Sequence, residues 1–232
     1  MILAAGKGTR LGALGEQQPK CMLTLGDRPL LQWTVEALCQ AGIRDIIVNL
    51  HHAPGVIPAH FGDGSGWGIR IEYVYEPEPL GTAGAVRNAR HLLGDQDPFL
   101  VLYGDTVLDW DPRPLIEAHR AGRPLVTIAV AEESDPSQFG VVQFDAVRRI
   151  HAFVEKPTDW RQLGRWVNAG VYALEPTIFD YLPATSFSDF GKDVFPRLLE
   201  AGHDLRAYPR PGALHAVDTP DQYCSARSSW TA

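Results

Sequence analysis

Glycines and cations follow an apolar run at the start of the chain. The run Met1–Ala5 leads into Gly6 and Gly8, and the nearby positive charges are Lys7, Arg10 and Lys20. When a buried strand ends in glycines, the backbone N–H groups of the following turn can approach an anion, and a helix that begins there strengthens the attraction. The spacing predicts a loop that binds a phosphate chain, with the three cations as counter-charges.

This glycine turn matches neither of the two standard phosphate-binding patterns. It is not G-x-G-x-x-G, and it is not G-x-x-x-x-G-K-[ST]. Without the lysine and the later motifs, an ordinary tight turn after a strand explains Gly6 and Gly8 equally well. The phosphate interpretation therefore depends on residues farther along the chain.

A carboxylate follows the clearest core strand of the sequence. Phe99–Tyr103 is a continuous apolar run, and Gly104 and Asp105 come directly after it. In open parallel sheets, ligands collect outside the carboxyl ends of the strands. A carboxylate at such an end is well placed to hold Mg²⁺ against phosphate oxygens. The competing interpretation is a turn residue or a helix N-cap, a role for which Thr106 is a rival.

A proline-rich turn and a stretch of small residues follow the strand expected at 69–75. Glu76 precedes the prolines, which forbid continued strand pairing, and Gly81 and Thr82 open a helix. Small residues at a helix start let a planar ligand lie against the backbone. The alternative is that Gly81 and Gly84 only permit close packing of the helix on a strand.

Two later segments carry polar side chains and a glycine on strands. Glu155 and Lys156 end an alternating strand, and Pro157 bends the chain there so that both side chains can face one pocket. The alternative is a solvated hairpin end, a common place for a Glu-Lys pair. Gly170 interrupts the strand expected at 167–174, and glycine inside a strand often marks the close approach of a ligand.

In this order, the motifs resemble those of the sugar nucleotidyltransferases, also called NDP-sugar pyrophosphorylases. The matching segments are LAAGKGTRL with the trailing Pro19-Lys20, then LGTAGAV, Gly104-Asp105, Val154-Glu155-Lys156-Pro157 and Asn168-Ala169-Gly170-Val171-Tyr172. The resemblance covers essentially the whole chain. Five motifs in the family's order are far more specific than any one of them.

The resemblance implies a role for each matched residue. The implied nucleotide-binding residues are Leu3, Ala4, Ala5, Gly6, Gly8, Thr9, Arg10, Lys20, Glu76, Gly81 and Thr82. The implied sugar-binding residues are Gly140, Glu155, Lys156, Asn168 and Gly170. The implied Mg²⁺ ligands are Asp105 and Asp218, and the residues implied for catalysis are Arg10, Lys20, Asp105 and Lys156.

The sequence departs from the family's pattern at three places. The family has Pro-Leu-Thr after Arg-Leu and Lys-Pro at the lysine, whereas this chain has Gly12-Ala13-Leu14 and Lys20-Cys21. These changes affect the shape of the loop and leave its charged groups in place. The family's pattern W-x-D-[IV]-G-T-P is also shortened here, because the [IV]-G pair between its Asp and its Thr is missing. Asp218 is kept as the second metal ligand because no other acid precedes Thr219-Pro220.

Composition limits the class of protein and of partner. The 232 residues are 45% hydrophobic and 21% charged with a net charge of −7, which suits one large α/β domain. An acidic chain without a basic run is a poor candidate for binding nucleic acid or a membrane. Three cysteines without CxxC spacing, and no leader or spanning segment, indicate a reducing cytoplasm. The expected assembly is a monomer or a small homo-oligomer, and the start inside a strand suggests that a few leading residues are absent.

The resemblance implies a single nucleotidyltransferase domain over 1–232, without a second domain or a β-helix. The expected fold is α/β, a Rossmann-like three-layer sandwich with a mixed, mainly parallel sheet. Its N-terminal half would bind the nucleotide, and its C-terminal half mainly the sugar. Segments 139–144 and 150–155 alternate and predict an antiparallel excursion, 189–199 reads as a capped helix, and Thr219 and Pro220 begin the last helix.

The activity that the resemblance implies is transfer of a nucleoside monophosphate from an NTP to a sugar 1-phosphate, with Mg²⁺ and with release of pyrophosphate. The segment EPLGTAG slightly favours GTP as the nucleotide. The acids Glu76 and Glu78 favour it too, because a carboxylate can accept hydrogen bonds from both N1–H and N2–H₂ of guanine. Uridylyl- or thymidylyltransferases of the same family remain alternatives. Two other classes also remain: a non-catalytic nucleotide-sugar binding module, and a glycosyltransferase that uses Asp109-Trp110-Asp111 as a D-x-D motif.

Overall fold

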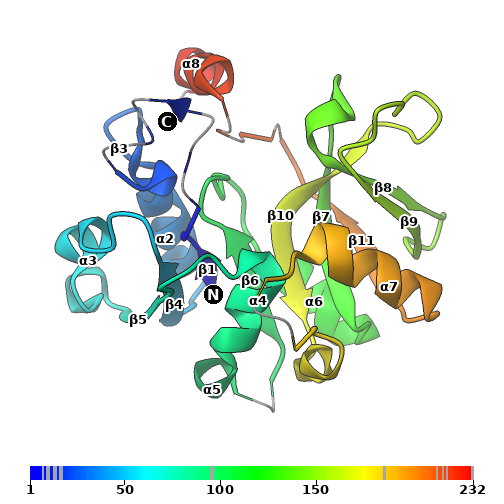
Figure 1. Ribbon diagram of the computed structural model, residues 1–232, viewed down its shortest axis with the longest axis horizontal. Coiled ribbons are helices and arrows are strands. Elements are labelled where there is room, and N and C mark those ends of the chain that lie inside the picture. The colour runs from blue at the N-terminus through cyan, green and yellow to red at the C-terminus, as the bar shows by residue number, and fades with distance from the viewer. Residues whose placement is uncertain are drawn as a thin grey trace. The chain divides into compact units, whose positions relative to one another are not determined.

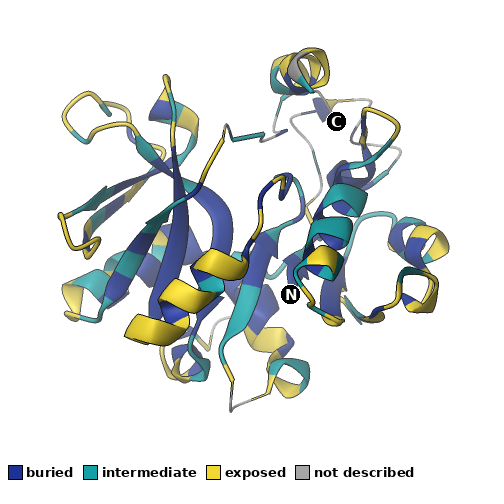
Figure 2. Cartoon of the chain, turned by 180° about the vertical axis from the view of Figure 1, so that it is seen from behind, coloured by how far each residue is buried: buried dark blue, intermediate teal, exposed yellow. Residues whose placement is uncertain are grey.

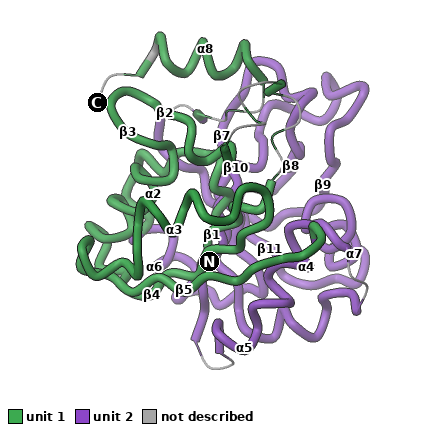
Figure 3. The backbone as a smooth tube through the Cα atoms, turned by 60° about the vertical axis from the view of Figure 1, so that its left-hand side comes forward, with its two compact units in different colours: residues 1–79, 102–112, 215–232 green, residues 80–101, 113–214 purple. Residues whose placement is uncertain are grey.

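The computed structural model describes residues 1–6, 8, 11–12, 15, 18–94, 97–184, 187–212, 214–215, 217 and 219–230 (Figure 1). Contacts along the chain divide it into two compact units. Unit 1 comprises residues 1–79, 102–112 and 215–232, and unit 2 comprises 80–101 and 113–214 (Figure 3). Strand β6 begins in unit 2 and ends in unit 1. Each unit is built from part of a mixed sheet with helices against it.

Unit 1 is organised on parallel strands. They lie in the order β6-β1-β4-β5, with bounds β1 (Ile2–Leu3), β4 (Asp45–Leu50), β5 (Arg70–Tyr75) and β6 (Phe99–Tyr103). The register pairs Leu3 with Asn49 on one side and with Tyr103 on the other. Parallel strands covered on both faces are near-continuously apolar, and β4 fits this pattern because every residue after Asp45 is buried.

Short elements and helices complete unit 1. They are η2 (Lys20–Met22), β2 (Thr24–Leu25), β3 (Arg28–Pro29), α2 (Leu30–Gln40), α3 (Val56–Phe61), η3 (Ser65–Trp67) and α8 (Pro220–Ser229). Helix α2 buries Leu31, Val35 and Leu38 at helical spacing. Helix α8 begins as predicted: Thr219 caps it in a capping box with Gln222, and Pro220 occupies the first turn.

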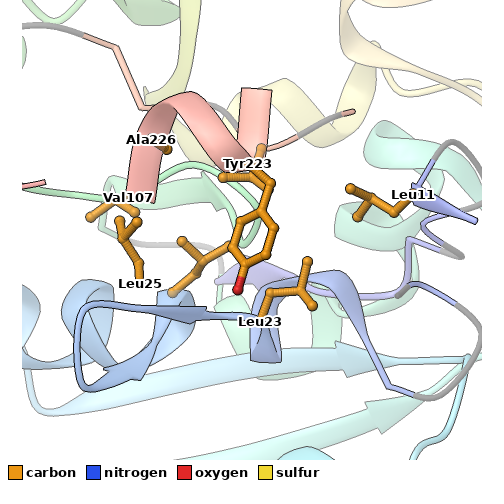
Figure 4. Close-up of a cluster of buried hydrophobic side chains, with 8 residues drawn as sticks. Leu11, Leu23, Leu25, Val107, Tyr223 and Ala226 are labelled. Carbon is orange, nitrogen blue, oxygen red and sulfur yellow. The ribbon is translucent and has the colours of Figure 1, made fainter. Parts of the chain in front are cut away.

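An apolar cluster joins the start and end of the chain within unit 1. Its buried members are Leu11, Leu23, Leu25, Leu30, Val107, Val217, Tyr223 and Ala226 (Figure 4). Tyr223 reaches from α8 towards Leu23, and its hydroxyl donates to the carbonyl of Thr24 at 2.7 Å. The cluster therefore packs residues that follow β1, Lys20 and Asp105 against one another, and it stabilises the segments that carry those groups.

Unit 2 contains both parallel and antiparallel pairs. Its strands are β7 (Val126–Glu132), β8 (Gly140–Phe144), β9 (Ile150–Glu155), β10 (Trp166–Leu174) and β11 (Leu205–Pro209). Strand β7 pairs parallel with β11 and antiparallel with β10. The antiparallel excursion expected at 139–155 is confirmed, because β8 pairs antiparallel with both β9 and β10. The mixed, mostly parallel α/β sheet predicted from the sequence is also confirmed.

The helices of unit 2 differ from expectation at two points. Their bounds are α4 (Gly81–Asn88), α5 (Arg90–Leu93), α6 (Arg113–Gly122), η4 (Pro136–Gln138), η5 (Pro176–Asp180), the π-helix η6 (Phe190–Val194) and α7 (Phe195–Glu200). Gly81 and Thr82 open a helix as expected, but α4 ends at Asn88 and a second short helix, α5, begins after Ala89. The helix expected over 189–199 is two elements in the structure. A π-helical turn, η6, comes first, and α7 follows it with Pro196 in its first turn. Figure 2 shows the buried residues concentrated along the strands.

No helix in the part of the chain that the structure describes combines the length and the apolar character needed to cross a bilayer.

Candidate active site

The carboxyl ends of the parallel strands β1, β4, β5 and β6 bring predicted site residues to one edge of the sheet. Ala4 follows β1, Glu76 follows β5, and Asp105 comes two residues after β6. The register between neighbouring strands keeps these ends level, since Leu3 pairs with Tyr103 and Leu50 with Tyr75. This is the edge at which open parallel sheets bind their ligands.

Lys20 and Asp105 form an ion pair at this edge. The Nζ atom of Lys20 lies 2.5 Å from Oδ2 of Asp105, and the two side chains are 10% and 36% exposed. The 3₁₀ turn η2 fixes the lysine, because Met22 N–H donates to Pro19 and Leu23 N–H donates to the carbonyl of Lys20. A cation this far from water needs an anionic partner, and in the structure that partner is Asp105.

Gly104 allows the strand end that carries Asp105 to lie close against β1. Its N–H donates to the carbonyl of Leu3 at 2.9 Å. A Cβ at position 104 would lie 2.9 Å from that same carbonyl oxygen and 3.4 Å from the Cβ of Cys21. A larger residue would push Asp105 away from the loop after β1.

Cys21 lies beside the ion pair and is not a nucleophile. Burial, together with the negative charge of Asp105, raises the pKa of its thiol to about 12. The thiol is therefore neutral at physiological pH, and Cys21 packs as a small apolar side chain.

Asn49 connects the loop after β1 to Glu76. Its Oδ1 accepts from the backbone N–H of Ala4 at 2.7 Å, and its Nδ2 donates to Oε1 of Glu76 at 2.8 Å. Asn49 and Glu76 are 3% and 1% exposed, so both hydrogen bonds are shielded from water. Nδ1 of His51 also contacts the carbonyl of Glu76 at 2.8 Å. Asn49 belongs to none of the sequence motifs, and the signal for its role is an amide inside the apolar run of β4.

Two glycines shape the loop between β1 and Lys20. Gly8 has a φ of +60°, and its carbonyl accepts from the N–H of Leu11 at 2.9 Å. A Cβ on Gly15 would overlap the carbonyl oxygen of Gly8, so the two arms of the loop touch at their backbones. A Cβ on Gly6 would meet nothing within 4 Å. Lys7, Thr9 and Arg10 lie outside the described residues, and so does Asp218.

In unit 2, Gly81 and Thr82 begin α4 against the segment that precedes η6. Gly81 has a φ of +72°, and a Cβ there would overlap the carbonyl oxygen of Ser188. Thr82 donates its N–H and its hydroxyl to Oδ1 of Asp189, at 3.1 and 3.2 Å. The close packing that the sequence offered as an alternative for Gly81 is therefore present.

Glu155 lies between two glycines of unit 2. Gly140 is its register partner on β8, and Gly191 belongs to η6. A Cβ on Gly140 would lie 2.8 Å from Oε2 of Glu155, and one on Gly191 would lie 2.7 Å from it. Because positions 140 and 191 are both glycine, the Glu155 carboxylate fits between them. Sequence analysis identified Gly140 but not Gly191.

Lys156 has a left-handed backbone and an exposed side chain. Its φ is +47°, a region that residues other than glycine rarely adopt, and its N–H donates to the carbonyl of Phe139 at 3.0 Å. Strained residues of this kind cluster at functional sites. This left-handed residue directly follows the end of β9 at Glu155.

Asn168 and Gly170 form a bulge in β10. The register with β7 shifts between Asn168 and Tyr172, and Gly170 has a φ of +70°. Asn168 accepts from Gly170 N–H at 3.0 Å and donates to the hydroxyl of Tyr172 at 2.7 Å. Bulges re-aim side chains next to active sites, and this one holds the amide of Asn168 in a fixed orientation.

Comparisons with known proteins agree with these features. The sequence profile of the nucleotidyl transferase family matches residues 1–231. The chain is 36% identical to the mannose-1-phosphate guanylyltransferase of Mycobacterium tuberculosis over 229 residues, which cover 96% of this chain and 62% of that protein. It is 34% identical to the UTP–glucose-1-phosphate uridylyltransferase of Synechocystis over 214 residues, which cover 87% of this chain and 55% of that protein. The chain thus spans about three fifths of the length of these relatives.

Solved structures share the fold over nearly the whole chain. A crystal structure of a Bacillus anthracis protein superposes with a TM-score of 0.88 at 24% identity, and covers 98% of this chain and 92% of that one. HddC from Yersinia pseudotuberculosis superposes with a TM-score of 0.82 at 26% identity, with 98% and 96% covered. A second crystal structure of HddC, complexed with GMP-PN, has a TM-score of 0.81 at 26% identity, again with 98% and 96% covered.

Proposed function

Because the chain belongs to the nucleotidyl transferase family, we propose that it transfers a nucleoside monophosphate from an NTP to a sugar 1-phosphate and releases pyrophosphate. The observation that carries this proposal is the ion pair of Lys20 and Asp105 at the carboxyl end of β6, next to the glycine loop of β1. We propose that residues 1–232 act as a single domain, with the nucleotide held mainly by its N-terminal half and the sugar mainly by its C-terminal half.

The chemistry needs little more than positioning. An oxygen of the sugar 1-phosphate attacks the α-phosphorus, and pyrophosphate departs in line with it. The nucleophile is already anionic, so neither a general base nor a Ser or Cys nucleophile is required. What the protein must supply is alignment of two mutually repelling anions and neutralisation of charge at phosphorus. Arg10 and Lys20 would hold the triphosphate, and Lys156 would bind the sugar phosphate.

The donor set at β6 fits a magnesium ion. Mg²⁺ is usually held by one or two carboxylates, and it takes its remaining ligands from substrate phosphates and water. The side chain of Asp105 is 36% exposed and uses Oδ2 for Lys20, which leaves Oδ1 without a hydrogen bond from the described residues. No group of three or more His, Cys, Asp or Glu side chains gathers among those residues, and the second proposed ligand, Asp218, lies outside them. Asp105, with Asp218, would hold the ion, and the ion would shield charge on the phosphates.

Guanine is the base that the comparisons favour. A guanylyltransferase and a guanine nucleotide complex occur among the similar proteins, although a uridylyltransferase is nearly as similar. The buried carboxylate of Glu76 is held by Asn49 at the end of β5. A carboxylate can accept both N1–H and N2–H₂ of guanine, whereas uracil and thymine each present one ring N–H between two carbonyls. We therefore propose GTP as the preferred nucleotide, with UTP and dTTP as the alternatives.

The protein's setting is part of the proposal. Cys21, Cys39 and Cys224 are all free thiols, which is consistent with a reducing cytoplasm. We propose that the partners are the two small substrates alone, without nucleic acid or membrane, and that the protein works as a monomer or a small homo-oligomer.

A substrate matrix tests the proposal. Purified protein with Mg²⁺ is incubated with each of GTP, UTP, dTTP, CTP and ATP against a panel of sugar 1-phosphates, and pyrophosphate release is measured. We expect release that requires both substrates and is fastest with GTP. Binding without pyrophosphate release would favour a non-catalytic module. Transfer of the sugar from an NDP-sugar would favour a glycosyltransferase.

A further inference from the structure

Helix α4 is capped by a residue more than a hundred positions away. Its own N-cap residue, Leu80, offers no side-chain acceptor. The N–H of Thr82 donates instead to Oδ1 of Asp189 at 3.1 Å, and the N–H groups of Ala83 and Gly84 donate to the carbonyl of Ser188 at 2.9 and 3.1 Å. These N–H groups of the first turn are therefore satisfied by one short segment of unit 2.

The contact between α4 and this segment is reciprocal. Ser188 N–H donates to the carbonyl of Leu80 at 2.9 Å, and Phe190 N–H donates to Oγ1 of Thr82 at 2.8 Å. Asp189 is itself held by η6, since its N–H donates to Oδ2 of Asp193 at 2.7 Å. Asp189 is thus held through its carboxylate by Thr82 and through its backbone N–H by Asp193.

The same segment continues into the element that confines Glu155. The π-helix η6 places Gly191 where a Cβ would lie only 2.7 Å from Oε2 of Glu155. Phe190 anchors η6 in the core by packing on Tyr172 and Phe195, with ring centroids 5.6 and 5.3 Å apart. π-helical turns are rare and occur frequently at functional sites.

We propose that Asp189 is a positioning residue that sets the start of α4, with Gly81 and Thr82, in register with the carboxylate of Glu155. The proposal rests on the function proposed above, in which Gly81 and Thr82 serve the nucleotide and Glu155 serves the sugar. Asp189 contacts neither substrate in this account. It acts through Thr82 on one side and through η6 and Gly191 on the other, so that one residue influences both substrates.

Substitutions at Asp189 separate this role from a general stabilising role. Asp189→Ala removes the acceptor for Thr82, and we expect KM for the NTP and KM for the sugar 1-phosphate each to rise about tenfold, with kcat changed less than about threefold. Asp189→Asn keeps an oxygen acceptor, and we expect it to restore both KM values to within about twofold of the wild type. Asp135→Ala is the matched control, because Asp135 caps η4 in the same unit through Ser137 N–H.

Amide hydrogen exchange tests the same coupling between α4 and the strand of Glu155 without an activity measurement. In Asp189→Ala we expect faster exchange in residues 81–88 and also in 140–155, while Asp135→Ala leaves both segments unchanged. If Asp189→Ala does not fold, Thr82→Val, which removes only the hydroxyl, must produce the same paired effect at smaller size. A change in one KM or one segment alone, or in neither, overturns the proposal. If the wild-type protein releases no pyrophosphate, the proposed function is overturned instead. The exchange measurement then still decides whether Asp189 couples α4 to the strand of Glu155.

Discussion

The Nζ atom of Lys20 lies 2.5 Å from Oδ2 of Asp105, which makes a cation and a carboxylate with different predicted duties direct partners. In the proposed reaction, Lys20 neutralises the triphosphate and Asp105 holds Mg²⁺. Each therefore holds the other in place until the substrates arrive. A buried charge without a partner is costly, so the ion pair holds the largely buried lysine in a fixed orientation.

The hydrogen-bonded pair of Asn49 and Glu76 predicts an effect on stability. In Asn49→Asp the new carboxylate can still accept from Ala4 N–H, but it cannot donate to Glu76 and it repels it. We expect the free energy of unfolding, measured in urea, to fall by about 2–4 kcal/mol. The double variant Asn49→Asp/Glu76→Gln restores a donor opposite the new carboxylate and should recover more than half of the loss. Equal stability of the two variants would contradict this account of Asn49.

Gly140 predicts a selective effect on the sugar substrate. A methyl group in Gly140→Ala would lie 2.5 Å from Cζ of Phe153 and 2.8 Å from Oε2 of Glu155, so the carboxylate must move. We expect KM for the sugar 1-phosphate to rise about tenfold or more, with the affinity for NTP measured by calorimetry unchanged. Gly66→Ala is the control, because a Cβ there meets nothing within 4 Å. Equal effects on both substrates would show that Gly140 serves the fold in general.

His119 predicts a loss of stability in mild acid. It is 1% exposed and contacts Thr127 Oγ1 through Nδ1 at 2.8 Å. Burial lowers the pKa of His119 below its ordinary value near 6.5, although Glu175 opposes the shift. The unfolded chain therefore binds the proton first, and stability falls as the pH drops through 6.5 towards the folded pKa, by at most about 1.4 kcal/mol per pH unit for one proton.

Urea unfolding of wild type and of His119→Gln at pH 7.5, 6.5 and 5.5 checks this dependence. The variant should lose less stability between pH 7.5 and 5.5 than the wild type does. His91→Gln, at an exposed position, should keep the wild-type slope. Parallel curves for wild type and His119→Gln would exclude His119 as the source.

Residues that act within their own strand or loop were accessible from the sequence. The apolar run of β6, the glycine before Asp105 and the Thr219-Pro220 start of α8 are local patterns, and each is confirmed at its element. The alternation at 139–155 predicted an antiparallel hairpin correctly because period-two patterning reports a strand directly. The family resemblance predicted from these motifs is confirmed as well.

Residues that act across long separations were not accessible. Asp189 has the type expected of an N-cap and was assigned to the helix that follows it, but its side chain caps α4 at Thr82 instead. Gly191 carries no motif, and its meaning depends on where Glu155 lies. In both cases the partner is determined by tertiary packing, which no local pattern records.

Turnover of Lys20→Ala and Asp105→Asn tests the central claim most directly. With the NTP and the sugar 1-phosphate that the matrix selects, pyrophosphate release by each folded variant should fall by about a hundredfold or more, and Asp105→Asn should also need more Mg²⁺ for half-maximal rate. The exposed pair of Arg70 and Asp45, 2.8 Å apart at the amino-terminal ends of β5 and β4, supplies the matched controls Arg70→Ala and Asp45→Asn, which should keep wild-type rates. Near-wild-type turnover in both Lys20→Ala and Asp105→Asn would contradict the account.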